Sequence, residues 1–259
     1  MNFTVLIPAR LQSTRLPGKV LLPIAGLPMI EWVRRCALGS GARRVVVAAD
    51  DAQILAAVEA HGGEVVQTNP RHSCGSERLA EAAEILGLPA DEIIVNLQGD
   101  EPLMPASLIH AVAAALAADP QLSVATAAVP MTRWEEFIDP HAVKVVLNAA
   151  GDALYFSRAP IPWDRDGYPL ADADAALPAG QHWRHLGLYA YRAGFLRDYA
   201  RWPRSALETI ESLEQLRILE RGERIRVCCG DMAAPIGVDT PADLVRVRAV
   251  FSTYEECRI

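Results

Sequence analysis

Short apolar runs alternate with longer amphipathic segments through the first half of the chain. The apolar runs are rich in valine and isoleucine, which is typical of strands buried on both faces of a parallel sheet. They lie at residues 4–7, 44–49, 64–68, 92–97 and 123–129. Segments with a helical period lie between them, at about 29–38, 52–61, 76–86 and 105–117. This alternation predicts an α/β fold with right-handed crossovers and an open, mostly parallel sheet that has helices on both faces.

The second half of the chain has a less regular pattern. Strand-like runs occur at 143–147, 153–157, 185–192 and 224–229. Ser205 and Glu208 have the spacing of a capping box, which predicts the start of a helix that runs to about Arg221. The second half therefore predicts additional strands and one long helix.

One stretch of the second half has neither a strand pattern nor a helical pattern. Residues 159–182 contain four prolines together with aspartate and glycine, which indicates a long excursion from the fold. No linker and no internal repeat divides the chain. We therefore expect a single domain over residues 1–259, with an inserted arm at about 150–190.

The composition narrows the class of protein and its partners. Of the 259 residues, 51% are hydrophobic and 22% are charged, which excludes intrinsic disorder. The net charge is −7, whereas a nucleic-acid binder usually carries a basic surface. Five cysteines without a CxxC pair argue against a disulfide framework and fit a cytoplasmic protein. The first residues resemble a strand rather than a signal peptide, and no apolar run reaches the ~18 residues of a membrane span.

A cationic loop follows the first predicted strand. It covers residues 8–19 and carries Arg10, Arg15 and Lys19, with hydroxyl side chains between them. Ligands of open parallel sheets bind beyond the carboxyl ends of the strands, so the loop is placed to bind a polyphosphate. Its residues do not follow the order of a Walker A loop, and no GxGxxG follows a predicted strand, which disfavours a dinucleotide fold. The alternative is a solvated basic loop in an acidic protein.

Two aspartates stand at the ends of predicted elements. Asp100 follows a buried run and Gly99, and Asp239 precedes the last predicted helix. Each alone could be an ordinary turn acid, but together they could meet at one Mg²⁺, which favours one or two carboxylates with phosphate oxygens and water. His182 and His185 are three residues apart, but no third ligand accompanies them, so the zinc interpretation is weak.

Seven segments spread over the whole chain carry a resemblance to one known family. They are PARLQSTRLPGK at 8–19, HSCGSERLAE at 72–81, VNLQGDEPL at 95–103, AVKVVLNAAGDALYFSRAPIPWDRD at 142–166, RHLGLYAYR at 184–192, LETIESLEQLRILERG at 207–222 and GVDTPADL at 237–244. In the same order, they resemble segments of the sugar-nucleotide cytidylyltransferases. Two places depart from that family: residues 11–13 lack its aromatic side chain, and residues 74–76 replace SGT.

The resemblance implies a fold, a reaction and an acceptor. The fold would be that of the nucleotide-diphospho-sugar transferases, which is Rossmann-like, with a β-rich arm that joins a homodimer. The reaction would transfer CMP from CTP to 3-deoxy-D-manno-octulosonate (Kdo) with the help of Mg²⁺, giving CMP-Kdo and pyrophosphate for lipopolysaccharide biosynthesis. Alternative acceptors are 8-amino-Kdo, sialic acid and methylerythritol phosphate. A nucleotide-sugar sensor without turnover is disfavoured by the combination of Lys19, Asp100 and Asp239.

The resemblance also implies roles for individual residues. Catalytic roles fall on Arg10, Arg15, Lys19, Asp100 and Asp239, with Asp100 and Asp239 as metal ligands. The nucleotide would contact Pro8, Ala9, Arg10, Ser13, Arg15, Lys19, Ser73, Gly75, Ser76, Gln98 and Asp100. The sugar would contact Arg78, Gln98, Arg158, His185, Tyr189, Glu214 and Gln215. From the residues alone, Glu214 could equally be a solvated helical side chain and His185 a half-buried, hydrogen-bonded histidine.

Overall fold

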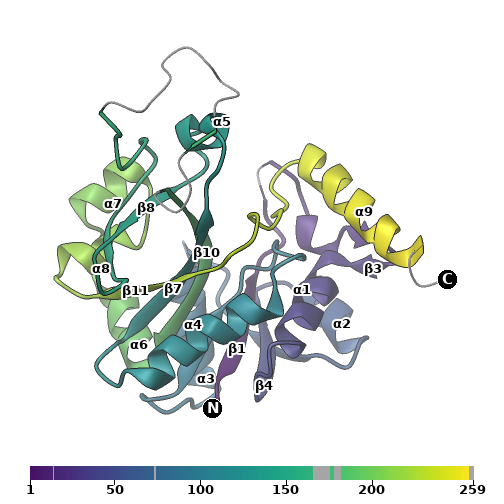
Figure 1. Cartoon of the computed structure of the whole chain (residues 1–259). Helices are drawn as coiled ribbons and strands as arrows, with labels where there is room; N and C mark the ends of the chain where they lie inside the picture. The colour runs from purple at the N-terminus through teal and green to yellow at the C-terminus, as the bar shows by residue number, and fades with distance from the viewer. Residues whose placement is uncertain (14, 73, 166–175, 178–181, 257–259) are drawn as a thin grey trace.

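A large mixed sheet forms the centre of the molecule. A computed structural model describes residues 1–13, 15–72, 74–165, 176–177 and 182–256. Within these residues the strands of the sheet are β1 (Thr4–Ala9), β4 (Arg44–Ala49), β5 (Glu64–Gln67), β6 (Ile93–Asn96), β7 (Val124–Pro130), β8 (Lys144–Leu147), β9 (Ala153–Ser157), β10 (Trp183–Arg192) and β11 (Ile225–Cys229). Their main order is β11-β7-β10-β6-β1-β4-β5, and β8 pairs with β10 and β9 (Figure 1).

The predicted α/β fold with an open, mostly parallel sheet is confirmed. β1 runs parallel to β4 and β6, β4 to β5, and β7 to β11. β8 runs antiparallel to both β9 and β10. Within the main strand order the exception is β10, which lies between β6 and β7 and runs antiparallel to both. The apolar pattern predicts that a strand lies there, but it carries no information about the direction of that strand.

Helices cover both faces of the sheet because successive strand residues point to opposite sides. Val5 and Ile7 pack in one apolar core and Leu6 in another, and all three are fully buried. The first core includes residues of α1 (Met29–Leu38), α2 (Ala52–Glu59) and α4 (Ala106–Ala118). The second includes residues of α3 (Gly75–Ile85), α6 (Ala193–Arg201) and α8 (Leu216–Glu220).

The last helix returns the end of the chain to its beginning. A long segment after β11 crosses the molecule to α9 (Pro241–Glu256), as Figure 1 shows. There Val247 and Phe251 pack with Ile24 and Met29, next to the small hairpin of β2 (Pro23–Ile24) and β3 (Leu27–Pro28). This return brings the segment around Asp239 beside the N-terminal loop. No helix of the described part of the chain is long and apolar enough to span a membrane.

The prediction of one helix from Ser205 to about Arg221 is wrong. The capping box at Ser205 is present, but α7 (Ala206–Glu211) ends at Ser212, whose φ of 51° is left-handed. The chain then turns before α8 begins. The polar and apolar spacing is compatible with one helix, whereas the backbone conformation of a single serine breaks it.

The strands within the predicted arm at about 150–190 belong to the main sheet. The arm contains β9, which pairs with β8, and most of β10. Residues 166–175 and 178–181 lie outside the described residues. Before the arm, α5 (Trp134–Ile138) contributes to a small separate core with Met131, Ala142 and Leu177.

Candidate functional site

Two adjoining cavities lie at the carboxyl ends of β1 and β6. The first, of about 310 Å³, is lined by Pro8, Ala9, Arg10, Gln12, Ser13, Arg15, Lys19, Val20, His72, Cys74, Gly75, Arg78, Gln98, Gly99, Asp100, Glu214 and Asp239. The second, of about 440 Å³, is lined by Gly75, Ser76, Asn96, Gln98, His141, Val143, Arg184, His185, Gly187, Tyr189, Tyr191, Tyr199, Ser212, Leu213, Glu214 and Gln215. Gly75, Gln98 and Glu214 belong to both linings, so the cavities meet at these residues.

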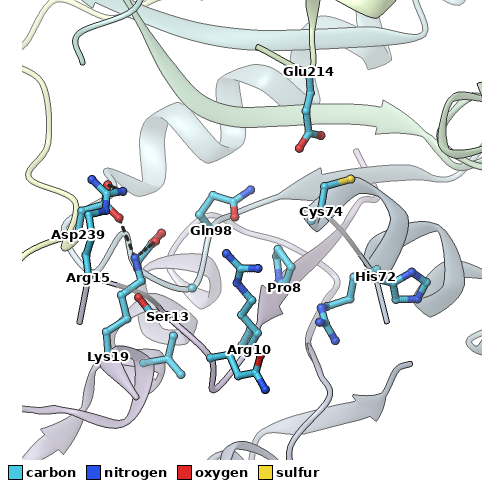
Figure 2. A pocket seen from close by; sticks show the side chains of 17 residues that line it. Pro8, Arg10, Ser13, Arg15, Lys19, His72, Cys74, Gln98, Glu214 and Asp239 are labelled. Carbon is cyan, nitrogen blue, oxygen red and sulfur yellow. Dashed lines mark hydrogen bonds and ion pairs between the residues drawn. The ribbon is translucent and has the colours of Figure 1, made fainter. Parts of the chain in front are cut away.

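The N-terminal loop holds its cations on a fixed backbone. Gly18 has a φ of 65°, a left-handed conformation that glycine adopts without strain, and its N–H donates to the Leu11 carbonyl at 3.2 Å. The short helix η1 (Lys19–Leu21) begins directly afterwards, with Val20 buried beneath it. Figure 2 shows Arg10 and Lys19 on this loop, with Glu214 facing them from the opposite wall.

Lys19 brings together the two aspartates that the sequence singles out. Its Nζ lies 2.6 Å from Asp100 Oδ2, 2.9 Å from Asp239 Oδ1 and 3.0 Å from the Val238 carbonyl oxygen. Arg15 pairs with the other oxygen of Asp239 at 3.0 Å. Burial alone would lower the pKa of Lys19, but the two carboxylates outweigh burial and raise it. The two acids that the sequence analysis expects to meet therefore do lie together, beside the cationic loop, while the chemical roles of these residues stay predictions.

Backbone contacts place Asp239 at this cavity. The Val238 N–H donates to the Asp100 carbonyl at 2.9 Å, which joins the segment before α9 to the turn after β6. Gly237 allows this approach, because a Cβ there would lie 2.6 Å from Glu101 Oε1. The Asp239 and Thr240 N–H groups both donate to the Asp243 carboxylate. The position of Asp239 is thus fixed from both sides.

Glu101 is a notable residue that sequence analysis missed. Burial raises the pKa of its carboxyl group to about 8, and the neighbouring charge of Asp100 adds to this effect. Its Oε2 is buried and makes no hydrogen bond within the described residues. Its position directly after Asp100 is the one feature of the sequence that could have drawn attention to it. Only the structure shows that its side chain points inward beneath Gly237.

The start of α3 forms the wall between the cavities. Ser76 Oγ donates to Glu214 Oε2 at 2.9 Å, so it joins α3 to the turn before α8. Gln98 donates to Asn96 Oδ1 at 3.2 Å. Arg78 lines the first cavity but is largely buried, with hydrogen bonds to Asp50 and Thr68 at 2.7 and 2.6 Å. Ser73, another predicted nucleotide contact, lies outside the described residues.

The residues of β10 that line the second cavity are Arg184, His185, Gly187, Tyr189 and Tyr191. His185 Nε2 lies 3.0 Å from Thr126 Oγ1, and burial lowers the pKa of the imidazole to about 3, so the ring is neutral at physiological pH. The Tyr189 hydroxyl makes no hydrogen bond within the described residues, and burial raises its pKa well above the usual value. The nearby Thr126 hydroxyl is engaged by His185 and by the Leu188 carbonyl.

The turn between α7 and α8 supplies the opposite wall. Glu214 and Gln215 lie in this turn rather than along a helix, because the expected helix is broken at Ser212. Tyr199 donates its hydroxyl proton to the Glu214 carbonyl at 2.9 Å. Gln215 is buried, and its Nε2 has no hydrogen-bond partner in the described part of the chain. The carboxylate of Glu214 and the amide of Gln215 therefore offer hydrogen-bonding groups to the cavity, and neither side chain is a cation.

The structure does not place Arg158 at either cavity, contrary to its predicted contact with the sugar. Its guanidinium donates to the carbonyls of Glu211 and Pro140 at 2.7 and 2.9 Å, so it ties the start of the arm to its neighbours. The cation that does line the second cavity is Arg184, which pairs with Glu136 at 2.7 Å. Sequence analysis missed Arg184, although it is adjacent to His185.

Comparison with known proteins identifies relatives over nearly the full length. A family model described as cytidylyltransferase matches residues 4–225. A protein named 3-deoxy-manno-octulosonate cytidylyltransferase from Acidithiobacillus ferrooxidans is 61% identical over 253 residues, which covers 97% of this chain and 100% of the relative. A protein of the same name from Hahella chejuensis is 57% identical over 251 residues, covering 96% and 98%.

A solved structure agrees with these relatives. CMP:2-keto-3-deoxy-manno-octonic acid synthetase complexed with CTP superimposes with a TM-score of 0.88 at 41% identity. The match covers 98% of this chain and 100% of that structure. Sequence and fold thus lead to the same family, and the chain belongs to the cytidylyltransferases, within their 3-deoxy-manno-octulosonate group.

Proposed function

We propose that this protein transfers CMP from CTP to Kdo and releases pyrophosphate. The observation that carries the proposal is the junction of the two cavities at Gln98 and Glu214. The first cavity gathers Arg10, Arg15 and Lys19, which suits the charge of a triphosphate. The second offers mostly neutral hydrogen-bonding groups, which suits a sugar rich in hydroxyls. The names of the relatives and the CTP complex of the solved structure support this assignment.

The residues of the first cavity fit a divalent cation. Oxygen atoms of Asp100, Asp239 and Val238 already converge on one cation, the Lys19 ammonium. Such hard oxygen ligands suit Mg²⁺. We propose that Asp100 and Asp239 hold Mg²⁺, which when bound would neutralise phosphate charge and lower the pKa of the attacking hydroxyl.

The chain itself contributes positioning and charge. The anomeric hydroxyl of the sugar gives up its proton to water and attacks the α-phosphorus, a new P–O bond forms, and the bond to the β-phosphate oxygen breaks as pyrophosphate leaves. Arg10 and Arg15 balance the charge of the phosphates from one side of the cavity. A guanidinium group suits this role because two of its N–H groups can donate to two oxygens of the same phosphate. Arg184 offers a cation to the sugar carboxylate, and neutral His185 a ring nitrogen to its hydroxyls. Bringing the reactants together in this way is the main source of rate in phosphoryl transfer.

Pyrophosphate release from CTP tests the proposed reaction. The protein is incubated with CTP and Mg²⁺ and with Kdo, 8-amino-Kdo, sialic acid or methylerythritol phosphate in turn. We expect release to require the sugar and to be fastest with Kdo. Faster release with another sugar would change the acceptor, and binding of CTP and Kdo without any release would indicate a sensor.

We also propose that the protein is a cytoplasmic homodimer joined through the arm and its neighbours. Leu154 on β9 and Ile210 on α7 are large apolar side chains that are 60% and 79% exposed, so a second copy could cover them. Burial of these side chains against a second copy would remove apolar surface from water. Sedimentation velocity at micromolar concentration tests this, and Leu154→Glu should shift a dimer toward monomer. A wild-type monomer would contradict the proposal.

A further inference from the structure

The ammonium group of Lys19 has every hydrogen bond that it can make. An ammonium has three N–H donors, and three oxygens of Asp100, Asp239 and Val238 lie within 3.0 Å of Nζ. Two of these oxygens belong to carboxylates and one to a backbone carbonyl, which is the oxygen chemistry that a hard divalent cation also uses. Lys19 therefore occupies the position at which the two proposed metal ligands converge.

We infer that Lys19 is a resident counter-ion that keeps free divalent metal out of the Asp100–Asp239 site until a triphosphate draws its ammonium away. This inference rests on the proposed function, because it assumes that both aspartates are metal ligands. It gives Lys19 a positioning role in the nucleotide-free protein in addition to its contact with phosphate. In that role Lys19 acts through the two carboxylates, which it holds close together before any ligand arrives.

Charge explains why metal alone would bind poorly. To reach Asp100 and Asp239, the metal has to displace two charge-assisted hydrogen bonds, each about twice as strong as a neutral one. The displaced ammonium then has to remain in a cavity that it shares with Arg10 and Arg15. Only 13% of the Lys19 side chain is exposed, so water replaces the lost partners incompletely.

A triphosphate removes this obstacle because it brings its own negative oxygens. The Lys19 backbone is held by the bond from its N–H to the Leu16 carbonyl at 3.2 Å and by the bond to its carbonyl from the Leu22 N–H at 3.1 Å. Any movement is therefore expected in the flexible side chain rather than in the loop. Lys19 already lines the cavity, so exchanging carboxylate for phosphate needs only a change of side-chain rotamer. By linkage, triphosphate then tightens metal binding and metal tightens triphosphate binding by the same factor.

Metal binding without nucleotide tests the inference. The full chain is titrated with Mn²⁺ alone, and free Mn²⁺ is followed by electron paramagnetic resonance. We expect Lys19→Met to lower the Kd for Mn²⁺ by ~10-fold or more, which is within the usual range of coupling between sites. Lys19→Met keeps an unbranched side chain as long as the lysine stem but leaves the two carboxylates facing each other without the ammonium.

Arg10→Met is the matched control, because it removes one positive charge from the same cavity. Figure 2 shows the Arg10 guanidinium well apart from Asp239. Its charge acts on the metal only at a distance, where salt screens it, so we expect a change in Kd of less than about threefold. Equal changes in the two variants would mean that the general charge of the cavity, and not the contact of Lys19, controls metal binding. That result, or an unchanged Kd in Lys19→Met, would overturn the inference.

Three further measurements keep the outcome clear. Far-ultraviolet circular dichroism checks that Lys19→Met is folded, and Lys19→Gln provides a second neutral variant for which we expect the same direction of change. Adding Asp100→Asn to Lys19→Met should abolish the gain in Mn²⁺ affinity, and a gain that persists would place the metal elsewhere. All of these readouts are made without CTP or sugar. Failure of the proposed reaction would appear instead as absent pyrophosphate release in the wild-type protein.

Discussion

The two cavities are built in different ways, although they share a wall. The first lies on the parallel half of the sheet, and most of its positive charge comes from one loop, residues 8–19. The second combines antiparallel β10 with the turn around Glu214, and its contacts are mostly neutral. Charge neutralisation is thus concentrated in one short segment of the chain, whereas recognition of the acceptor depends on side chains from segments that are distant in sequence.

The largest effect is expected in the first cavity. Lys19→Ala should lower kcat by roughly 10²–10³, the scale of losing one group that stabilises the transition state. Steady-state pyrophosphate release measures it. Arg201→Ala is a suitable control, because Arg201 is 71% exposed and pairs with Glu84 away from both cavities. Unchanged kcat and KM in Lys19→Ala would remove the charge-based cavity from the mechanism.

A smaller effect of a different kind is expected in the second cavity. Gln215→Ala removes a buried amide whose nitrogen has no partner in the described residues. If this amide binds the sugar, its loss should raise the KM for the sugar about tenfold, as for one hydrogen bond, and leave the KM for CTP unchanged. Gln121→Ala on an exposed turn is the control. An equal rise in both KM values would show that the cavities do not divide the substrates.

A pair of tyrosines separates binding from support within the second cavity. Tyr199→Phe loses the hydrogen bond to the Glu214 carbonyl and should lower the free energy of unfolding by about 1 kcal/mol. Tyr189→Phe removes a hydroxyl that makes no hydrogen bond within the described residues, so the free energy should not fall. It should instead raise the KM for the sugar a few-fold. Urea denaturation and steady-state kinetics distinguish the two, and the reverse pattern would assign the roles the other way.

The smallest effect at neutral pH concerns His185. Its pKa is about 3 in the folded protein and near 6.5 when exposed, so between these values the unfolded chain binds the extra proton. His185 therefore has no influence on the pH dependence of stability above about pH 6.5 and destabilises the fold progressively as the pH falls below it. His185→Gln should lose less stability than wild type between pH 7.5 and about pH 4.5 in urea denaturation. If the free energies of unfolding of His185→Gln and wild type changed with pH in parallel, this would contradict the neutral, buried state of the His185 ring.

The sequence predicts the first cavity better than the second for a physical reason. The charges of residues 8–19 are neighbours in the chain, and the ends of parallel strands share one edge, so their meeting with Asp100 could be inferred. The sequence also singles out Asp239, but its approach depends on Gly237 and the return of the chain to α9. The strands and helices of the first half follow from apolar periodicity in the same way.

The remainder depends on features that no local pattern encodes. The break at Ser212 moves Glu214 off a helix, although the apolar spacing is compatible with one. Arg158 looks like a cation for the sugar, but three backbone carbonyls nearby engage its guanidinium. The inward turn of Glu101 likewise depends on the absence of a Cβ at Gly237, far away in sequence.

The position of β10 has a consequence for how the molecule is made. β6 and β7 are both hydrogen-bonded to β10, which is formed by residues 183–192. Until the ribosome has added those residues, each of the two earlier strands leaves a bare edge that can pair with another nascent chain. The central sheet can therefore close only late in synthesis, and contacts so distant along the chain are expected to form slowly.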